Sequence, residues 1–151
     1  MESKSEKFCQ VCISGEVAAV KEMLQSDPGL ANAFGMVRSD HREFMKKNNA
    51  EGGWSALHLA AHYGQTAVVR ALIEAGADLN ALSMNGEANT PLMAAVAGGS
   101  AEIVSLLAEG GADPLKTDGS GKFNALKLAE VDKKPDLAVI LQKFVSEKRK
   151  V

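Results

Sequence analysis

Two cysteines lie three residues apart near the start of the chain, in the sequence Cys9-Gln10-Val11-Cys12. A C-x-x-C pair carries thiol–disulfide chemistry when its first thiolate is stabilised at a helix N-terminus. Here both cysteines fall inside a segment that we expect to be helical, and no second pair supplies the remaining ligands of a zinc site. We interpret Cys9 and Cys12 as small buried hydrophobic residues, and redox or metal chemistry is the alternative.

Two histidines, His58 and His62, are four residues apart, so one helix face would carry both imidazoles. This is the spacing of a two-histidine metal site, but the residues between them lack the glutamate of the zinc-protease motif. We therefore expect no bound metal. The alternative from another functional class is an enzyme or a metal or redox protein that uses Cys9/Cys12 or His58/His62.

Glycine clusters at Gly98-Gly99 and Gly119-Ser120-Gly121 have neither the spacing of a phosphate loop nor that of a dinucleotide-binding fingerprint. No G-x-S-x-G nucleophile motif occurs in the sequence. We expect these glycines to form turns, and we expect neither catalysis nor a cofactor.

The composition is that of one globular domain, with 151 residues, 46% hydrophobic and 24% charged. The 17 Lys and Arg nearly balance the 19 Asp and Glu, which gives no electrostatic basis for nucleic-acid or anionic-membrane binding. We see neither a membrane span nor a secretory signal. Two cysteines indicate a reducing compartment, so we expect the cytoplasm, and the basic Lys148-Arg149-Lys150 leaves the nucleus as an alternative.

The segments that position these residues repeat along the chain. At an offset of 35 residues, Ser55–Ala61 falls on Thr90–Val96 and Gly76-Ala77-Asp78 falls on Gly111-Ala112-Asp113. A further 34 residues on, Asn124–Ala129 takes the same place. A more divergent first unit precedes these three. The period predicts a stack of similar units.

Each unit has the signals of two helices and a projecting loop. Ser55 and Thr90 suit helix N-caps, and Pro91 suits the first helical position. We expect helices over about 56–63 and about 66–75, separated by Gly64. The polar stretch after Gly76 contains Asn85-Gly86, which is a hairpin signal.

The segments Gly53–Gly64, Gly76–Ala81 and Thr90-Pro91-Leu92 resemble the ankyrin-repeat family. The resemblance implies an all-α solenoid of four helix-turn-helix units with hairpin-like fingers, similar to small free-standing members of the family. We expect residues 1–151 to form a single ankyrin-repeat domain. Its parts are repeat 1 (about 5–34), an insertion (about 35–52), repeat 2 (about 53–87), repeat 3 (about 88–121) and repeat 4 (about 122–146).

The resemblance also implies which positions line a concave binding face, and that His58 hydrogen-bonds between adjacent repeats. The expected partner-binding residues are Trp54, His62, Tyr63, Leu82, Asn89, Ala97, Phe123, Val131 and Asp132. Met84 is also an expected partner-binding residue because, like Leu82, it has no helical partner in its own unit. Both side chains could instead pack against the next finger. Aromatic side chains often anchor protein interfaces, but Trp54 could alternatively pack between repeats.

The insertion is the part of the chain that departs most from the repeat pattern. Asp40 and Glu43 resemble a capping box, and Arg38, Arg42 and Phe44 are expected to contact a partner. Long loops are commonly functional, so we hypothesise that the insertion extends the binding face; a solvated loop is the alternative.

We expect a non-catalytic scaffold, inhibitor or assembly subunit that binds another protein and is monomeric when free. Nucleic acid and membrane are not expected as partners.

Deleting residues 36–49 should weaken binding of the partner, because the deletion removes the expected contact residues of the insertion. Unchanged affinity of the deletion variant for every partner would contradict a binding role for this segment.

Overall fold

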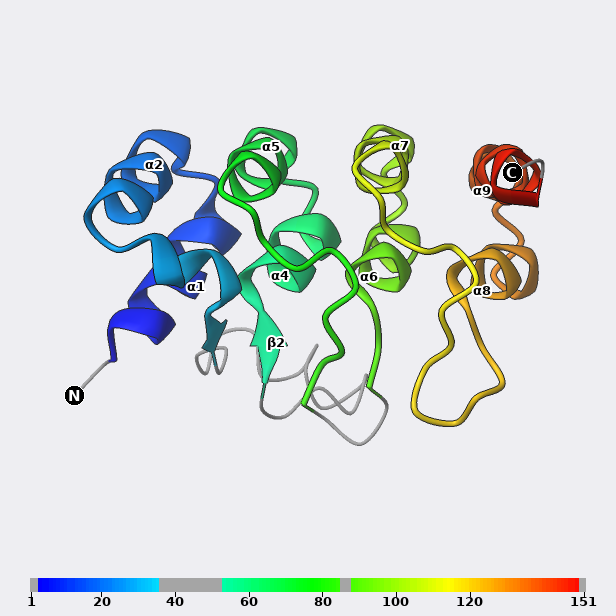
Figure 1. The fold of residues 1–151 in the computed structure, drawn as a ribbon, viewed down its shortest axis with the longest axis horizontal. Helices are drawn as coiled ribbons and strands as arrows, with labels where there is room; N and C mark the ends of the chain where they lie inside the picture. Colours follow the sequence, from blue (N-terminus) through cyan, green and yellow to red (C-terminus); the bar gives the residue numbers. More distant parts are fainter. Residues whose placement is uncertain (1–2, 36–52, 85–87, 150–151) are drawn as a thin grey trace.

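The computed structural model describes residues 3–35, 53–84 and 88–149. These residues stack into two layers of helices (Figure 1). The inner layer holds α1 (Lys4–Ser14), α4 (Ala56–His62), α6 (Pro91–Gly98) and α8 (Ala125–Val131). The outer layer holds α2 (Val17–Ser26), α5 (Thr66–Glu74), α7 (Ala101–Glu109) and α9 (Pro135–Arg149). The predicted fold class, an all-α stack of four helix pairs, is confirmed.

The repeat boundaries proposed from the sequence enclose these pairs, except that α1 begins at Lys4 and α9 continues to Arg149. A 3₁₀ helix, η1 (Pro28–Asn32), and the short strand β1 (Phe34–Gly35) follow the first pair, and the strand β2 (Trp54–Ser55) precedes α4. In the described part of the chain, no helix is long and apolar enough to cross a membrane.

The inner helices begin at the N-cap residues and end near the glycines that the sequence predicts. The Ser55 and Thr90 hydroxyls each accept a hydrogen bond from a backbone N–H in the first turn, both at 3.2 Å. After the inner helices, the chain turns through left-handed glycines such as Gly64 (φ 73°) and Gly99 (φ 78°). Lys133 takes this conformation in the last unit (φ 56°), which costs roughly 1–2 kcal/mol for a residue with a side chain.

Small residues bring the inner helices close together. The packing of α4 against α6 is the most extensive contact between two elements, and it buries Ala60, Ala61 and Ala95 completely. At the end of α6, a Cβ atom on Gly98 would overlap the carbonyl oxygen of His62. Any side chain at residue 98 would therefore push the two helices apart.

Hydrogen bonds also join successive units through asparagine side chains. The Oδ1 atom of Asn32 accepts the backbone N–H of Asp78, and that of Asn80 accepts the backbone N–H of Asp113, both at 2.8 Å. The position 35 residues after Asn80 is Leu115, which is 39% exposed. These hydrogen bonds from Asn32 and Asn80 form a ladder between units, and this asparagine ladder therefore ends with the third unit.

The two ends of the insertion are held next to each other. Strands β1 and β2 pair antiparallel, with Gly35 opposite Trp54. The backbone N–H of Met84, in the second finger, donates to the Gly53 carbonyl at 2.7 Å. Residues 36–52 and the hairpin signal at Asn85-Gly86 lie outside the described residues.

Replacing Asn80 with alanine should lower the free energy of unfolding by about 1–2 kcal/mol, because the backbone N–H of Asp113 loses its acceptor. Chemical denaturation measures this loss. Gln142→Ala is the matched control, since Gln142 is exposed on α9, and its effect should stay within about 0.5 kcal/mol. Equal stabilities for the two variants would contradict a stabilising role for the ladder.

Candidate functional site

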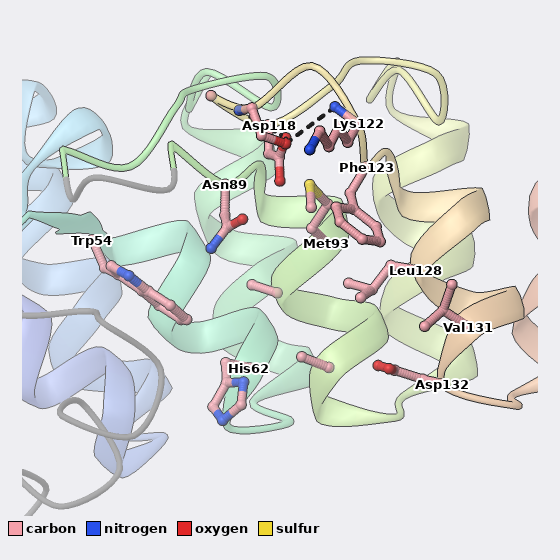
Figure 2. A pocket seen from close by; sticks show the side chains of 14 residues that line it. Trp54, His62, Asn89, Met93, Asp118, Lys122, Phe123, Leu128, Val131 and Asp132 are labelled. Carbon is pink, nitrogen blue, oxygen red and sulfur yellow. Dashed lines mark hydrogen bonds between the residues drawn. The ribbon is translucent and has the colours of Figure 1, made fainter.

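A groove of about 730 Å³ crosses the inner layer from α4 over α6 to α8 (Figure 2). Seven residues expected to bind a partner line it: Trp54, His62, Asn89, Ala97, Phe123, Val131 and Asp132. Its other lining residues are Met93, Ala94 and Leu128 from the inner helices, and Asp118, Gly119, Ser120 and Lys122 from the third finger. The floor is largely apolar, and polar groups stand along both edges.

Three further expected residues lie elsewhere. Tyr63 is half-buried beside the groove, and its ring meets the His62 ring edge-to-face at 5.2 Å between centroids. Leu82 and Met84, in the second finger, are 40% and 71% exposed and do not line the groove. Arg38, Arg42 and Phe44 lie outside the described residues.

Trp54 forms one end of the groove and is also part of the core. Its side chain is only 4% exposed, and its ring centroid lies 5.8 Å from those of His58 and His62. The pairing of β2 with β1 places it there. Trp54 is thus part of the hydrophobic core and also lines the groove.

His58 connects the second unit to the third. Its Nε2 atom lies 2.7 Å from the carbonyl oxygen of Asn89, and its Nδ1 atom lies 2.6 Å from the Ser55 hydroxyl. A carbonyl can only accept, so Nε2 carries the proton and Nδ1 accepts from Ser55. The inter-repeat hydrogen bond expected from the family resemblance is present. Both ring nitrogens are engaged, so neither is free to bind a metal.

The two histidines along α4 are held uncharged near neutral pH. Burial lowers the pKa of His58 to about 4, although the hydrogen bond to Asn89 opposes the shift. Burial also lowers the pKa of His62, and the positive charge of Lys134 adds to this effect. A hydrogen bond to the backbone of Ala94 opposes the shift at His62.

The charged residues at the groove edges differ in their hydrogen-bond partners. The Asp118 carboxylate accepts hydrogen bonds from the Ser120 backbone at 3.0 Å and from the Ser120 hydroxyl, so it stabilises the finger turn. The Lys134 ammonium donates to the Val96 carbonyl at 2.6 Å, which places it at the end of α6. Among the described residues, the Asp132 carboxylate has no hydrogen bond or ion pair.

The cysteines have the environment of core residues. Cys9 and Cys12 are 1% and 0% exposed inside α1. Burial, with a smaller contribution from Glu6, raises the pKa of Cys9 to about 12, and burial also raises the pKa of Cys12. Both thiols therefore stay protonated, which disfavours thiolate chemistry. Within the described ranges, no three His, Cys, Asp or Glu side chains gather as a metal site would need.

A model of ankyrin repeats, in three copies, matches residues 8–118. The chain belongs to the ankyrin-repeat family. Ankyrin repeats mediate protein–protein interactions, so this chain carries a protein-interaction module.

Two curated relatives share the repeats. A palmitoyltransferase, AKR1, from Lachancea kluyveri is 35% identical over 124 residues, which are 82% of this chain and 15% of that protein. The human BCL-6 corepressor-like protein 1 is 34% identical over 96 residues, which are 64% of this chain and 5% of that protein. The chain thus spans only a small part of the length of these relatives.

Several lining residues were not expected from the sequence. Met93 stands 35 residues after His58, and Leu128 stands 34 residues after Ala94, so both occupy positions of inner helices that repeat along the chain. The periodicity predicts that such positions are buried, but it does not say which of them face the groove. The glycine cluster at 119–121 was a signal for the third finger, whose turn brings Asp118 and Lys122 to the groove edge.

Acidification should destabilise the protein through His58. Its pKa is about 4 when folded and 6.5 as a free group, so the unfolded chain binds more protons between these pH values. The resulting loss approaches about 3 kcal/mol as the pH falls from 7 to 4. Urea denaturation at a series of pH values should show a shallower pH dependence in His58→Gln than in the wild type. Parallel curves for the two proteins would contradict the assigned role of His58.

Proposed function

We propose that this ankyrin-repeat chain is a non-catalytic scaffold, inhibitor or assembly subunit that binds another protein in the groove between its inner helices and fingers. The observation that carries the proposal is a preformed groove whose apolar floor, including Met93, Leu128 and Val131, lies between polar edges. Such a surface combines an apolar centre with a polar rim, as specific protein interfaces do.

The rigidity of the groove supports binding to a partner. Met93 and Ala94 are 4% and 3% exposed, and Trp54 is held by the pairing of β2. Side chains that are already fixed lose little conformational freedom when a partner docks, so more of the contact energy contributes to affinity.

The absence of catalysis is also part of the proposal. The ring nitrogens of His58 are both engaged, and burial keeps the thiols of Cys9 and Cys12 protonated. The transferase named in the comparison is nearly seven times the length of the matched part of its sequence, so we attribute to this chain the function of the shared repeats alone. The free thiols of Cys9 and Cys12 favour a reducing compartment such as the cytoplasm.

The proposal is tested by filling the groove without disturbing the core. Ala97 is exposed on the groove floor, so Ala97→Phe should block the partner sterically and lower its recovery from a cell lysate by about tenfold, equivalent to about 1.4 kcal/mol. Quantitative mass spectrometry of the captured proteins gives the measurement. Trp54→Ala is less informative, because emptying a core site costs about 3 kcal/mol or more of stability.

Ala67→Phe is the matched control. Ala67 is exposed on α5 in the outer layer, so the same added ring should leave capture unchanged. Thermal unfolding followed by circular dichroism confirms that both variants are folded. Equal recovery of every captured protein by Ala97→Phe and Ala67→Phe would reject the groove as the binding site.

A further inference from the structure

The groove ends at a carboxylate that has no partner within the described residues. Asp132 directly follows α8, and its backbone N–H donates to the Leu128 carbonyl at 2.9 Å. Its side chain is exposed and lines the groove (Figure 2). The carbonyl end of a helix carries a partial negative charge, so α8 adds to the negative potential at Asp132.

The neighbouring charged groups do not neutralise Asp132. The Lys134 ammonium donates to the carbonyls of Val96 and Ala97, at 2.6 and 3.2 Å, so it is directed to the end of α6 and forms no ion pair with Asp132. Lys133 is exposed and forms no ion pair with Asp132. Lys122 extends from the third finger, along the other edge of the groove (Figure 2).

An apolar surface adjoins this carboxylate on the same helix. Leu128 and Val131 precede Asp132 by four residues and by one, and both line the groove. Val131 is 57% exposed, so its side chain is available for contact with a partner. The ring of Phe123 borders the same surface (Figure 2). A segment lying here would therefore meet an apolar surface and a negative charge within one helical turn.

We propose that the occupant of the groove is a peptide segment of a partner protein in which an apolar side chain lies next to a lysine or arginine. This inference rests on the proposed function of the groove. The apolar side chain covers Leu128, Val131 and Phe123, and the basic side chain pairs with Asp132. An acidic residue at the same place would be repelled by both the carboxylate and the carbonyl end of α8.

The size of the effect follows from the exposure of Asp132. Ion pairs in contact with solvent contribute little, so loss of this pair should weaken binding by roughly two- to fivefold rather than abolish it. Charge reversal replaces attraction with repulsion and should weaken binding further. The apolar contacts should account for most of the affinity.

The probe is a library of random 12-residue peptides displayed on phage and selected on the wild-type chain. The expected result is enrichment of peptides with Lys or Arg beside an aliphatic or aromatic residue. One enriched peptide, labelled with fluorescein, should bind Asp132→Asn roughly two- to fivefold more weakly in fluorescence anisotropy. Asp132→Lys should bind more weakly still, and the control Glu74→Gln, which changes an exposed carboxylate on α5, should bind like the wild type.

A double-mutant cycle tests whether the basic residue of the peptide pairs with Asp132. If the basic residue of the peptide meets Asp132, replacing that residue with glutamine should make the peptide insensitive to Asp132→Asn. An undiminished loss with the glutamine peptide would overturn the inference.

The outcomes separate this inference from the proposed function. Peptides that lose binding to Ala97→Phe but show no preference for basic residues would overturn the inference and leave the proposed function standing. Enrichment of acidic peptides that require the groove would do the same. Selected peptides that bind Ala97→Phe as well as the wild type, or a selection that enriches no peptide, would contradict the groove itself and hence both.

Discussion

The spacing between neighbouring inner helices determines where every other feature of this protein lies. That spacing is set by alanines buried between α4 and α6, and by Gly98, whose missing side chain admits the carbonyl of His62. Both layers also bury larger side chains, such as Leu57 on α4 and Leu72 on α5. Tight inner contacts align α4, α6 and α8 side by side, and their shared face becomes the floor of the groove. A substitution that separates these helices would therefore change stability and the groove together.

Among the second, third and fourth units, the buried hydrogen-bonded connection made by His58 occurs at only one of the three equivalent positions. His58 joins Ser55 in its own unit to the Asn89 carbonyl in the next, and the pKa near 4 is the consequence of burying an imidazole there. At the equivalent position of the third unit stands Met93, and in the fourth stands Lys127. Methionine cannot make this connection, but it supplies a flexible apolar surface. Met93 forms part of the groove floor, so the departure from the repeat pattern coincides with the binding surface.

The sequence predicted what depends on local chemistry. Helix starts at Ser55 and Thr90 and the turn at Gly64 follow from interactions within a few residues, and the repeat period extended them to the whole stack. The burial of Trp54 depends instead on β2 pairing with β1, across an insertion whose length no periodicity encodes. The third finger is similar, because Asp118 reaches the groove edge only through a turn that its own side chain stabilises.

The negative charge at one end of the groove is related to the position of α8 in the last unit of the stack. The ends of two inner helices are reached by side chains from the following unit, since Gln65 donates to the Ile13 carbonyl of α1 and Lys134 donates to the Val96 carbonyl of α6. These two donors stand at equivalent positions, immediately before α5 and α9. In the described part of the chain no unit follows the one that contains α8, so no side chain reaches the carbonyl end of α8 in this way. Side-chain donors therefore reach the carbonyl ends of α1 and α6, whereas the partial negative charge at the end of α8 lies next to the exposed side chain of Val131.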